Sequence, residues 1–189
     1  MKKFTIFSLL SIVLFTTAIS ASESEKEYKS FKLSNLNGLQ APSYIAKQPT
    51  IYKEECASCH MGYQAEFLPK SSWIKLMNQK NLSDHFGVDA SLEENDRKKI
   101  LHYLIKNAAD SKYVGKYYKK FAKTVDPKQP FTISKSRYFI KEHRKIPKKL
   151  IKQKEVKTFA NCLACHKDAE VGTYKEHFIT IPNYGKWDD

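Results

Sequence analysis

The four cysteines of this 189-residue chain fall into two short runs with the same spacing. Each run is Cys-x-x-Cys followed at once by histidine, at residues 56–60 and 162–166. This pattern is the attachment signature of c-type haem, in which two thiols bond the porphyrin and the adjacent histidine binds the iron. The spacing suits this chemistry because thiols three residues apart lie on one side of a helical turn. We therefore predict two covalently attached haem c groups. The predicted residues are Cys56, Cys59 and the proximal ligand His60 for the first haem, and Cys162, Cys165 and the proximal ligand His166 for the second.

Three other interpretations of the cysteines are weaker. Disulfides within the pairs would each close a loop of only two residues, which constrains the unfolded chain very little. A structural zinc site made from all four cysteines explains the pairs but leaves both following histidines as coincidence. A thioredoxin-like redox pair lacks the βαβ pattern that usually surrounds it.

The ligand on the other face of each iron decides what the haem can do, because an open position permits gas binding or catalysis whereas a second strong ligand favours electron transfer. For the first haem we favour His85, which lies in a turn-like segment 25 residues after His60 (85 − 60). Asp84 or a nearby carbonyl could orient its ring. A surface histidine in a turn is the alternative, and Met77 is a minor one. His102 is expected on the solvated face of its helix, because lysines occupy three of the four positions three and four residues away.

The second haem leaves two candidates for the same role. His143 precedes Cys162 by 19 residues (162 − 143), and His177 follows His166 by 11 (177 − 166). We favour His143 and keep His177 as the alternative.

The N-terminus has the pattern of a secretory signal peptide. Residues 1–21 begin with two lysines, continue with an apolar stretch of about a dozen residues and end in small residues. We expect cleavage near Ser20 or Ala21 and a periplasmic mature protein with no later transmembrane segment. A polar lead segment then follows over residues 22–48.

The rest of the chain divides at a Pro-containing break, residues 126–130, into a first haem domain over 49–125 and a second over 126–189. The clearest helix begins after the capping-box pattern of Ser91 and Glu94, with Ser91 as N-cap. Shorter helices are expected near residues 73–80 and 112–123, and a strand only at 178–181. The apolar face of the long helix comprises Ile100, Leu101, Leu104, Ile105 and Ala108. We predict a mostly α fold with extensive irregular chain, a small cytochrome c-like helical fold wrapped around two covalent haems.

The charge is strongly basic. The formal net charge is +13, and loss of the two lysines in the signal peptide leaves +11 (13 − 2). Export argues against nucleic acid as the partner of this charge. An acidic redox protein or an anionic membrane surface is the better interpretation, and a merely solvated basic surface stays open.

With these residues in view, the chain resembles the diheme cytochrome c family over residues 52–182. The resemblance implies a periplasmic electron carrier with two histidines on each iron, at positions that match His85 and His143, and donation of electrons to a small oxygen-binding monohaem cytochrome c. The chain departs from the family in being lysine-rich between residues 112 and 157. The matching segments are 55–61, 68–69, 72–73, 84–87, 138–139, 143–147, 160–166, 168–170 and 181–182.

The expected function is therefore single-electron transfer by a protein that is not an enzyme. The alternative is a haem enzyme or enzyme subunit, such as a peroxidase or a sulfur-compound oxidoreductase, with one open haem site.

Overall fold

The computed structural model describes residues 45–188. The predicted signal peptide and most of the predicted lead segment lie outside these residues. Within them the chain is mostly helical, as predicted, with short helices joined by irregular segments. The α-helices are α2 (Thr50–Cys56), α3 (Lys70–Leu76), α4 (Gln79–Leu82), α5 (Glu94–Lys106), α6 (Lys116–Thr124), α7 (Arg137–His143) and α8 (Lys148–Ile151). The 3-10 helices are η1 (Ala65–Phe67), η2 (Ile133–Lys135), η3 (Cys162–Ala164), η4 (Ala169–Val171) and η5 (Glu176–Phe178).

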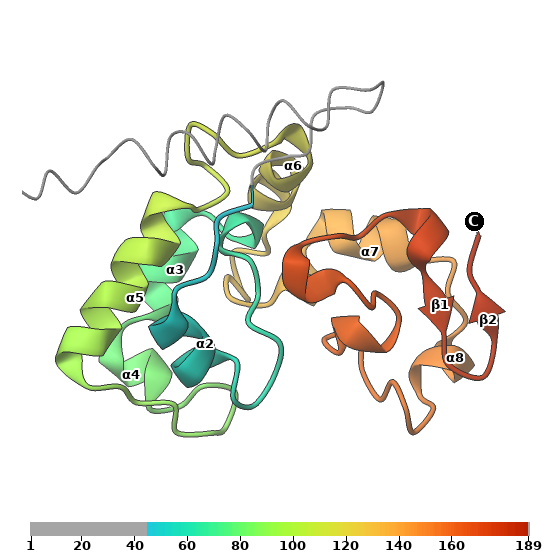
Figure 1. Ribbon diagram of the computed structural model, residues 1–189, viewed down its shortest axis with the longest axis horizontal. Coiled ribbons are helices and arrows are strands. Elements are labelled where there is room, and N and C mark those ends of the chain that lie inside the picture. The colour runs from blue at the N-terminus through green and yellow to red at the C-terminus, as the bar shows by residue number, and fades with distance from the viewer. Residues whose placement is uncertain (1–44, 189) are drawn as a thin grey trace, which may run out of the picture. The chain divides into compact units, whose positions relative to one another are not determined.

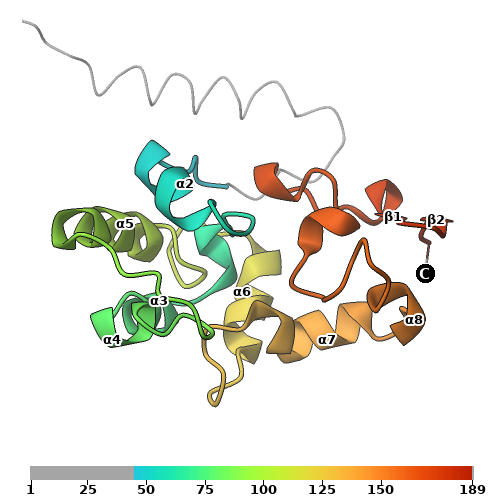
Figure 2. The ribbon, with the colours of Figure 1, turned by 90° about the horizontal axis from the view of Figure 1, so that it is seen from below.

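A first group of helices, α2 to α5, packs around one hydrophobic core and lies together in Figures 1 and 2. The apolar face predicted for α5 forms the centre of this core. Ile100, Leu104 and Ala108 are buried, and Leu101 and Ile105 are partly buried. The pattern did not single out Tyr103, which is also buried and packs on Tyr52 with ring centroids 5.2 Å apart.

The predicted N-cap of α5 is wrong. The helix begins at Glu94 with Glu93 as its N-cap residue, and no side chain caps it. Ser91 lies before that point, where its backbone N–H donates to the Asp89 carboxylate at 2.9 Å. Glu94 does not reach back, because it pairs instead with Arg97 and Lys98 one turn further on. These forward ion pairs compete with the capping box that the sequence predicted.

The second group of elements follows the predicted break. Residues 126–130 form a turn in which the Gln129 N–H donates to the Asp126 carbonyl. The helices on either side of this turn nevertheless share one aromatic cluster, in which the Phe121 ring of α6 lies 5.0 Å from that of Tyr138 in α7. The predicted helix over 112–123 is observed as α6, which begins four residues later than predicted and ends one residue later, at Thr124.

The predicted strand over 178–181 is shorter than expected. Its first residue lies in η5, and only β1 (Thr180–Ile181) is extended, paired antiparallel with β2 (Gly185–Lys186). Ile181 is fully buried in a small core with Leu150 and Val156, on which α8 packs (Figure 1). Among residues 45–188, none of the helices has the length and apolar character needed to cross a membrane.

Candidate haem sites

The first attachment motif lies at the end of α2. The helix ends at Cys56, the Ala57 N–H closes it by donating to the Lys53 carbonyl, and Cys59 and His60 follow in bends. The helical turn expected for the two thiols is therefore an irregular turn past the helix end. Burial, with a smaller contribution from Glu55, raises the pKa of the Cys56 thiol to about 12. Neither Cys56 nor Cys59 forms a disulfide.

The structure brings His85 opposite His60. The two ring centroids are 6.1 Å apart with an interplanar angle of 32°. The Nδ1 atom of His60 lies 2.8 Å from the Met61 carbonyl, which leaves its Nε2 atom available. Burial, followed by the nearby His60, lowers the pKa of His85, which favours the neutral ring. The buried Nδ1 atom of His85 has no hydrogen-bond partner in the part of the chain that is described.

His85 begins a tight two-residue turn. Its N–H donates to the Val88 carbonyl at 2.8 Å, and the Val88 N–H donates back at 3.2 Å. Both central residues have positive φ, +54° at Phe86 and +87° at Gly87, as a type I′ turn requires. Asp84 does not orient the His85 ring, since its carboxylate accepts from the Gly87 N–H and so stabilises the turn.

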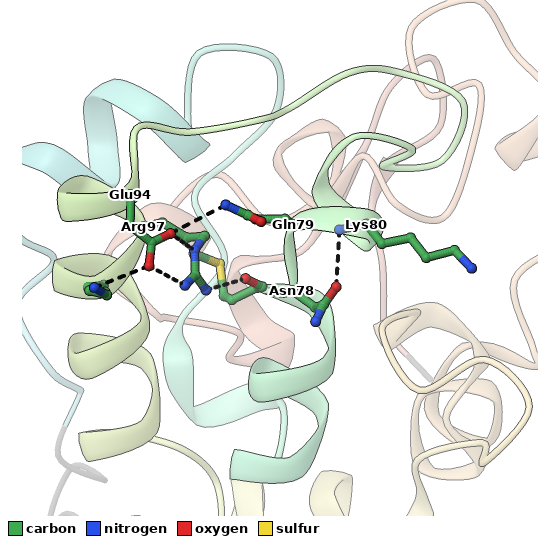
Figure 3. A network of polar contacts seen from close by, with 7 residues as sticks. Asn78, Gln79, Lys80, Glu94 and Arg97 are labelled. Atoms are coloured by element: carbon green, nitrogen blue, oxygen red, sulfur yellow. Dashed lines mark hydrogen bonds and ion pairs between the residues drawn. The ribbon is translucent and has the colours of Figure 1, made fainter.

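A polar network holds the corner that precedes this turn (Figure 3). The guanidinium of Arg97 donates to the Met77 carbonyl at 2.8 Å and twice to the Glu94 carboxylate. The Asn78 side chain caps α4 by accepting from the Lys80 N–H. These contacts join α5 to the α3–α4 corner. The Met77 side chain, a minor candidate ligand, packs in the core of the first group.

The second attachment motif forms the 3-10 helix η3. The Cys165 and His166 N–H groups both donate to the Cys162 carbonyl. The C-terminal segment then holds the motif from the other side, because Thr180 donates to the Cys165 carbonyl and Ile179 forms an isolated β-bridge with His166. Burial is the main reason that the pKa of the Cys162 thiol rises to about 11.

The structure places His143, at the end of α7, opposite His166. Their ring centroids are also 6.1 Å apart, with an interplanar angle of 69°. The Nδ1 atom of His143 lies 2.9 Å from the Phe139 carbonyl, and its ring stacks on the Phe139 ring at 3.8 Å. Burial, followed by the neighbouring His143, lowers the pKa of His166 to about 4, so this ring is neutral as well.

An apolar pocket contains this second pair together with Cys162 and Cys165. Aromatic and branched aliphatic side chains make up most of its wall. They are Tyr63, Phe67, Tyr117, Phe121, Ile133, Phe139, Ile146, Ile151, Val156, Phe159, Tyr174, Ile179 and Trp187.

The two remaining histidines lie elsewhere. His177 is exposed, packs on Phe178 at 4.0 Å and does not line the pocket. His102 is exposed on α5, as the lysines around it predicted.

The donor sets fit two haem irons better than a zinc ion. An imidazole nitrogen binds a first-row metal at about 2.0 Å, so two rings on opposite sides of one ion have centroids roughly 6 Å apart. Both histidine pairs have this separation, and each lies beside a pair of unpaired thiols. Nowhere in residues 45–188 do three histidine, cysteine or acidic side chains gather as a zinc site would need.

Sequence reasoning missed several residues around these sites. Phe139 lies one helical turn before His143, and this i, i+4 spacing could have identified it. Tyr63, Gln64 and Tyr174 also lie between or beside the sites, but no spacing pattern in the sequence marks them.

Comparison with known proteins agrees with this geometry. The family model for dihaem cytochrome c matches residues 52–174. The structure of the diheme cytochrome type c from Shewanella baltica OS155 is 33% identical, with 76% of this chain and 100% of that chain covered and a TM-score of 0.61. The diheme cytochrome c from Rhodobacter sphaeroides is 36% identical, with 69% of this chain and 100% of that chain covered and a TM-score of 0.58. No curated protein sequence matches the chain.

The family match covers well over half of the chain, and the resemblance inferred from the motifs is confirmed. The chain belongs to the dihaem cytochrome c family, a family of electron-transfer proteins, and carries two c-type haems.

Proposed function

We propose that this protein is an exported, periplasmic electron carrier in which two histidines bind each haem iron. The pairs are His60 with His85, and His166 with His143. The observation that carries the proposal is the 6.1 Å separation within each pair, which suits one metal ion between the two rings.

This ligation favours electron transfer over catalysis. The haem iron, when bound, takes up and releases one electron. With His60 and His85 on one iron and His166 and His143 on the other, neither iron would have an open position for a peroxide or another substrate. The Met61 and Phe139 carbonyls, next to the Nδ1 atoms of His60 and His143, hold those rings in place as the oxidation state changes.

Loss of one ligand tests the proposal. We expect His85→Ala and His143→Ala each to turn one haem high-spin and able to bind carbon monoxide, while the parent protein stays low-spin and binds none. His102→Ala and His177→Ala are the matched controls, because both residues are exposed histidines. A high-spin haem in His177→Ala would move the second ligand to that residue. Carbon monoxide binding by the parent protein would favour the alternative of an enzyme with an open site.

Export rests on the N-terminal sequence, which has a basic start, an apolar stretch and a small-residue end. We expect cleavage near Ser20 or Ala21, which the mass of the mature protein would show.

For the partner we propose an acidic redox protein, and from the family resemblance an oxygen-binding monohaem cytochrome c. The lysines of α8 support this. Lys148 and Lys149 are exposed, while Ile151 of the same helix lines the pocket of the second haem site. A basic surface beside a haem would attract an acidic partner and speed a weak encounter by roughly 10- to 1,000-fold at low salt.

Charge reversal tests this surface. Lys148→Glu with Lys149→Glu should slow electron transfer to the acceptor at low ionic strength and leave both haem spectra unchanged. Reversal of the exposed Lys75 and Lys80, in α3 and α4, alters the net charge equally and is the control. Equal slowing by both double variants, or a rate indifferent to salt, would mean that the α8 lysines have no specific role.

A further inference from the structure

Two residues that lie three and four positions after the first attachment motif, Tyr63 and Gln64, bind the chain on both sides of the second motif. The Tyr63 hydroxyl donates to the Ala160 carbonyl at 2.8 Å, two residues before Cys162. The Gln64 side chain donates to the Ala169 carbonyl at 2.7 Å and to the Glu170 carbonyl at 3.1 Å, just after the motif. Tyr63 and Gln64 therefore hold the second motif from its two ends.

Tyr63 also contacts one proximal histidine, and Gln64 is linked to the other through Tyr174. The Tyr63 ring lies 5.2 Å from the His60 ring, and Tyr63 lines the pocket of the second site. On the other side, the Tyr174 hydroxyl donates to the Gln64 side-chain oxygen at 2.6 Å, and the Tyr174 ring lies 5.4 Å from the His166 ring. A short series of contacts thus joins one proximal ligand to the other.

Burial makes the contacts of Gln64 costly to break. Gln64 is only 1% exposed, and both its amide nitrogen and its amide oxygen are hydrogen-bonded. A buried polar group that loses its hydrogen-bond partner destabilises the fold, because no water replaces that partner. The Tyr63 carbonyl in turn accepts from the Tyr52 hydroxyl at 2.7 Å, which ties the segment to α2.

We propose that Tyr63, Gln64 and Tyr174 form a positioning bridge that fixes the two haems relative to each other and thereby sets the electronic and electrostatic coupling between them. The inference rests on the proposed ligation of both irons. The interaction of two charged centres falls with their separation, and a well-packed interior holds a separation steady. With both haems bound, a bridge that holds their separation constant would also hold constant the effect of one haem's charge on the potential of the other.

The test compares two identical substitutions in the haem-loaded protein. Gln64→Leu removes the bridge, whereas Gln153→Leu removes the same kinds of contact within the second group alone. Gln153 also donates to a backbone carbonyl, that of Leu150 at 2.7 Å, and its oxygen also accepts from a side chain, that of Asn183 at 2.9 Å. The readouts are the iron–iron distance distribution from pulsed EPR and the separation of the two midpoint potentials in a redox titration.

For Gln64→Leu we expect a broader and longer distance distribution and a smaller separation of the two potentials, with both haems still low-spin. Gln153→Leu should lower the stability but leave both readouts at the parent values. Tyr63→Phe and Tyr174→Phe each remove one hydroxyl and keep the ring, so they replace Gln64→Leu if that variant does not fold. We expect them to change the distance distribution and the separation of the potentials in the same direction, by smaller amounts. The absorption spectrum reports separately on which ligands bind the irons. An error in the proposed ligands can therefore be distinguished from a failure of the bridge hypothesis. Parent-like distances and potentials in the folded bridge variants, or equal changes in Gln153→Leu, would overturn the inference.

Discussion

The two haem sites use the same attachment motif in different surroundings. At the first site, a tight turn presents His85, and polar contacts of Asp84 and Arg97 hold that turn and the corner before it. At the second, α7 presents His143 from upstream of the motif, within an apolar, aromatic pocket. The motif therefore determines how the haem is attached, while the surrounding elements determine its environment. Because burial and polarity around the iron tune its reduction potential, we expect the two haems to differ in potential.

The buried polar side chains show the same contrast. Gln64, Glu66, Ser72 and Ser111 are buried before the break at residues 126–130, and Ser136 alone is buried among the described residues after it. Buried polar side chains thus come mainly from the part of the chain before the break, although Gln64 forms its hydrogen bonds with residues after it.

We expect the largest effect from a substitution that removes an apolar side chain from the pocket of the second site. Phe139 is buried and stacks on His143, so Phe139→Ala should cost about 3–5 kcal/mol of unfolding free energy and loosen the second haem's ligation. The matched change at the first site is Phe86→Ala, whose ring also contacts the candidate ligand but is 67% exposed. Its effect should stay within about 0.5 kcal/mol. Urea unfolding of the haem-loaded proteins measures both, and equal losses would contradict the contrast between the sites.

A smaller effect tests the polar support of the first site. Arg97→Ala removes the hydrogen bond to the Met77 carbonyl from a side chain that is 17% exposed, and we expect a loss of about 1–2 kcal/mol. NMR signals of the first haem should shift, and those of the second should not. Lys99→Ala on the same helix is the control, because its ion pair with Asp96 is exposed and contributes little. Shifts at both haems would show that the corner does not act on the first site alone.

Substitution of two serines tests whether side chains cap helices α7 and α5. Ser136 caps α7, the helix that presents His143, by accepting from the Phe139 N–H at 3.2 Å. Ser136→Ala should therefore cost about 1 kcal/mol. Ser91→Ala should cost much less, because Ser91 is exposed and does not cap α5. Thermal unfolding decides between them, and a larger loss at Ser91 would restore the capping box that the sequence predicted.

The smallest expected effect is a change in pH dependence at Glu66. Its side chain is fully buried; one oxygen accepts from the Ala46 N–H, and the other has no partner within residues 45–188. Burial raises the pKa of this carboxyl above its ordinary value of 4.5, so the native state holds the proton more tightly than the unfolded state does. The contribution of Glu66 to the free energy of unfolding is therefore fully present below pH 4.5 and is lost as the pH rises through the pKa of the folded state.

Glu66→Gln should remove this loss, so the variant should gain stability relative to the parent as the pH rises. The net change at acid pH should be small, because the amide keeps an acceptor for Ala46 but also leaves one group unpaired. Urea midpoints between pH 4 and pH 8 would measure it. A difference between the two proteins that is independent of pH would mean that Glu66 ionises normally.

The cofactor chemistry and much of the helical content could be predicted from the amino-acid sequence alone. The two Cys-x-x-Cys-His motifs predict haem attachment because the chemistry needs these residue types at a fixed local spacing. The apolar periodicity of α5 predicted its buried face for a similar reason, since it depends only on the helical repeat. The helix start was wrong because Glu94 has forward partners that the capping pattern alone does not reveal.

The surroundings of each haem site depend on contacts between distant parts of the chain, which only the folded structure shows. It placed His143 rather than His177 opposite His166. Tyr63 and Gln64 meet partners that lie 97 to 110 residues further along the chain. No local pattern records such contacts, because they form only when the folded chain brings the two motifs together.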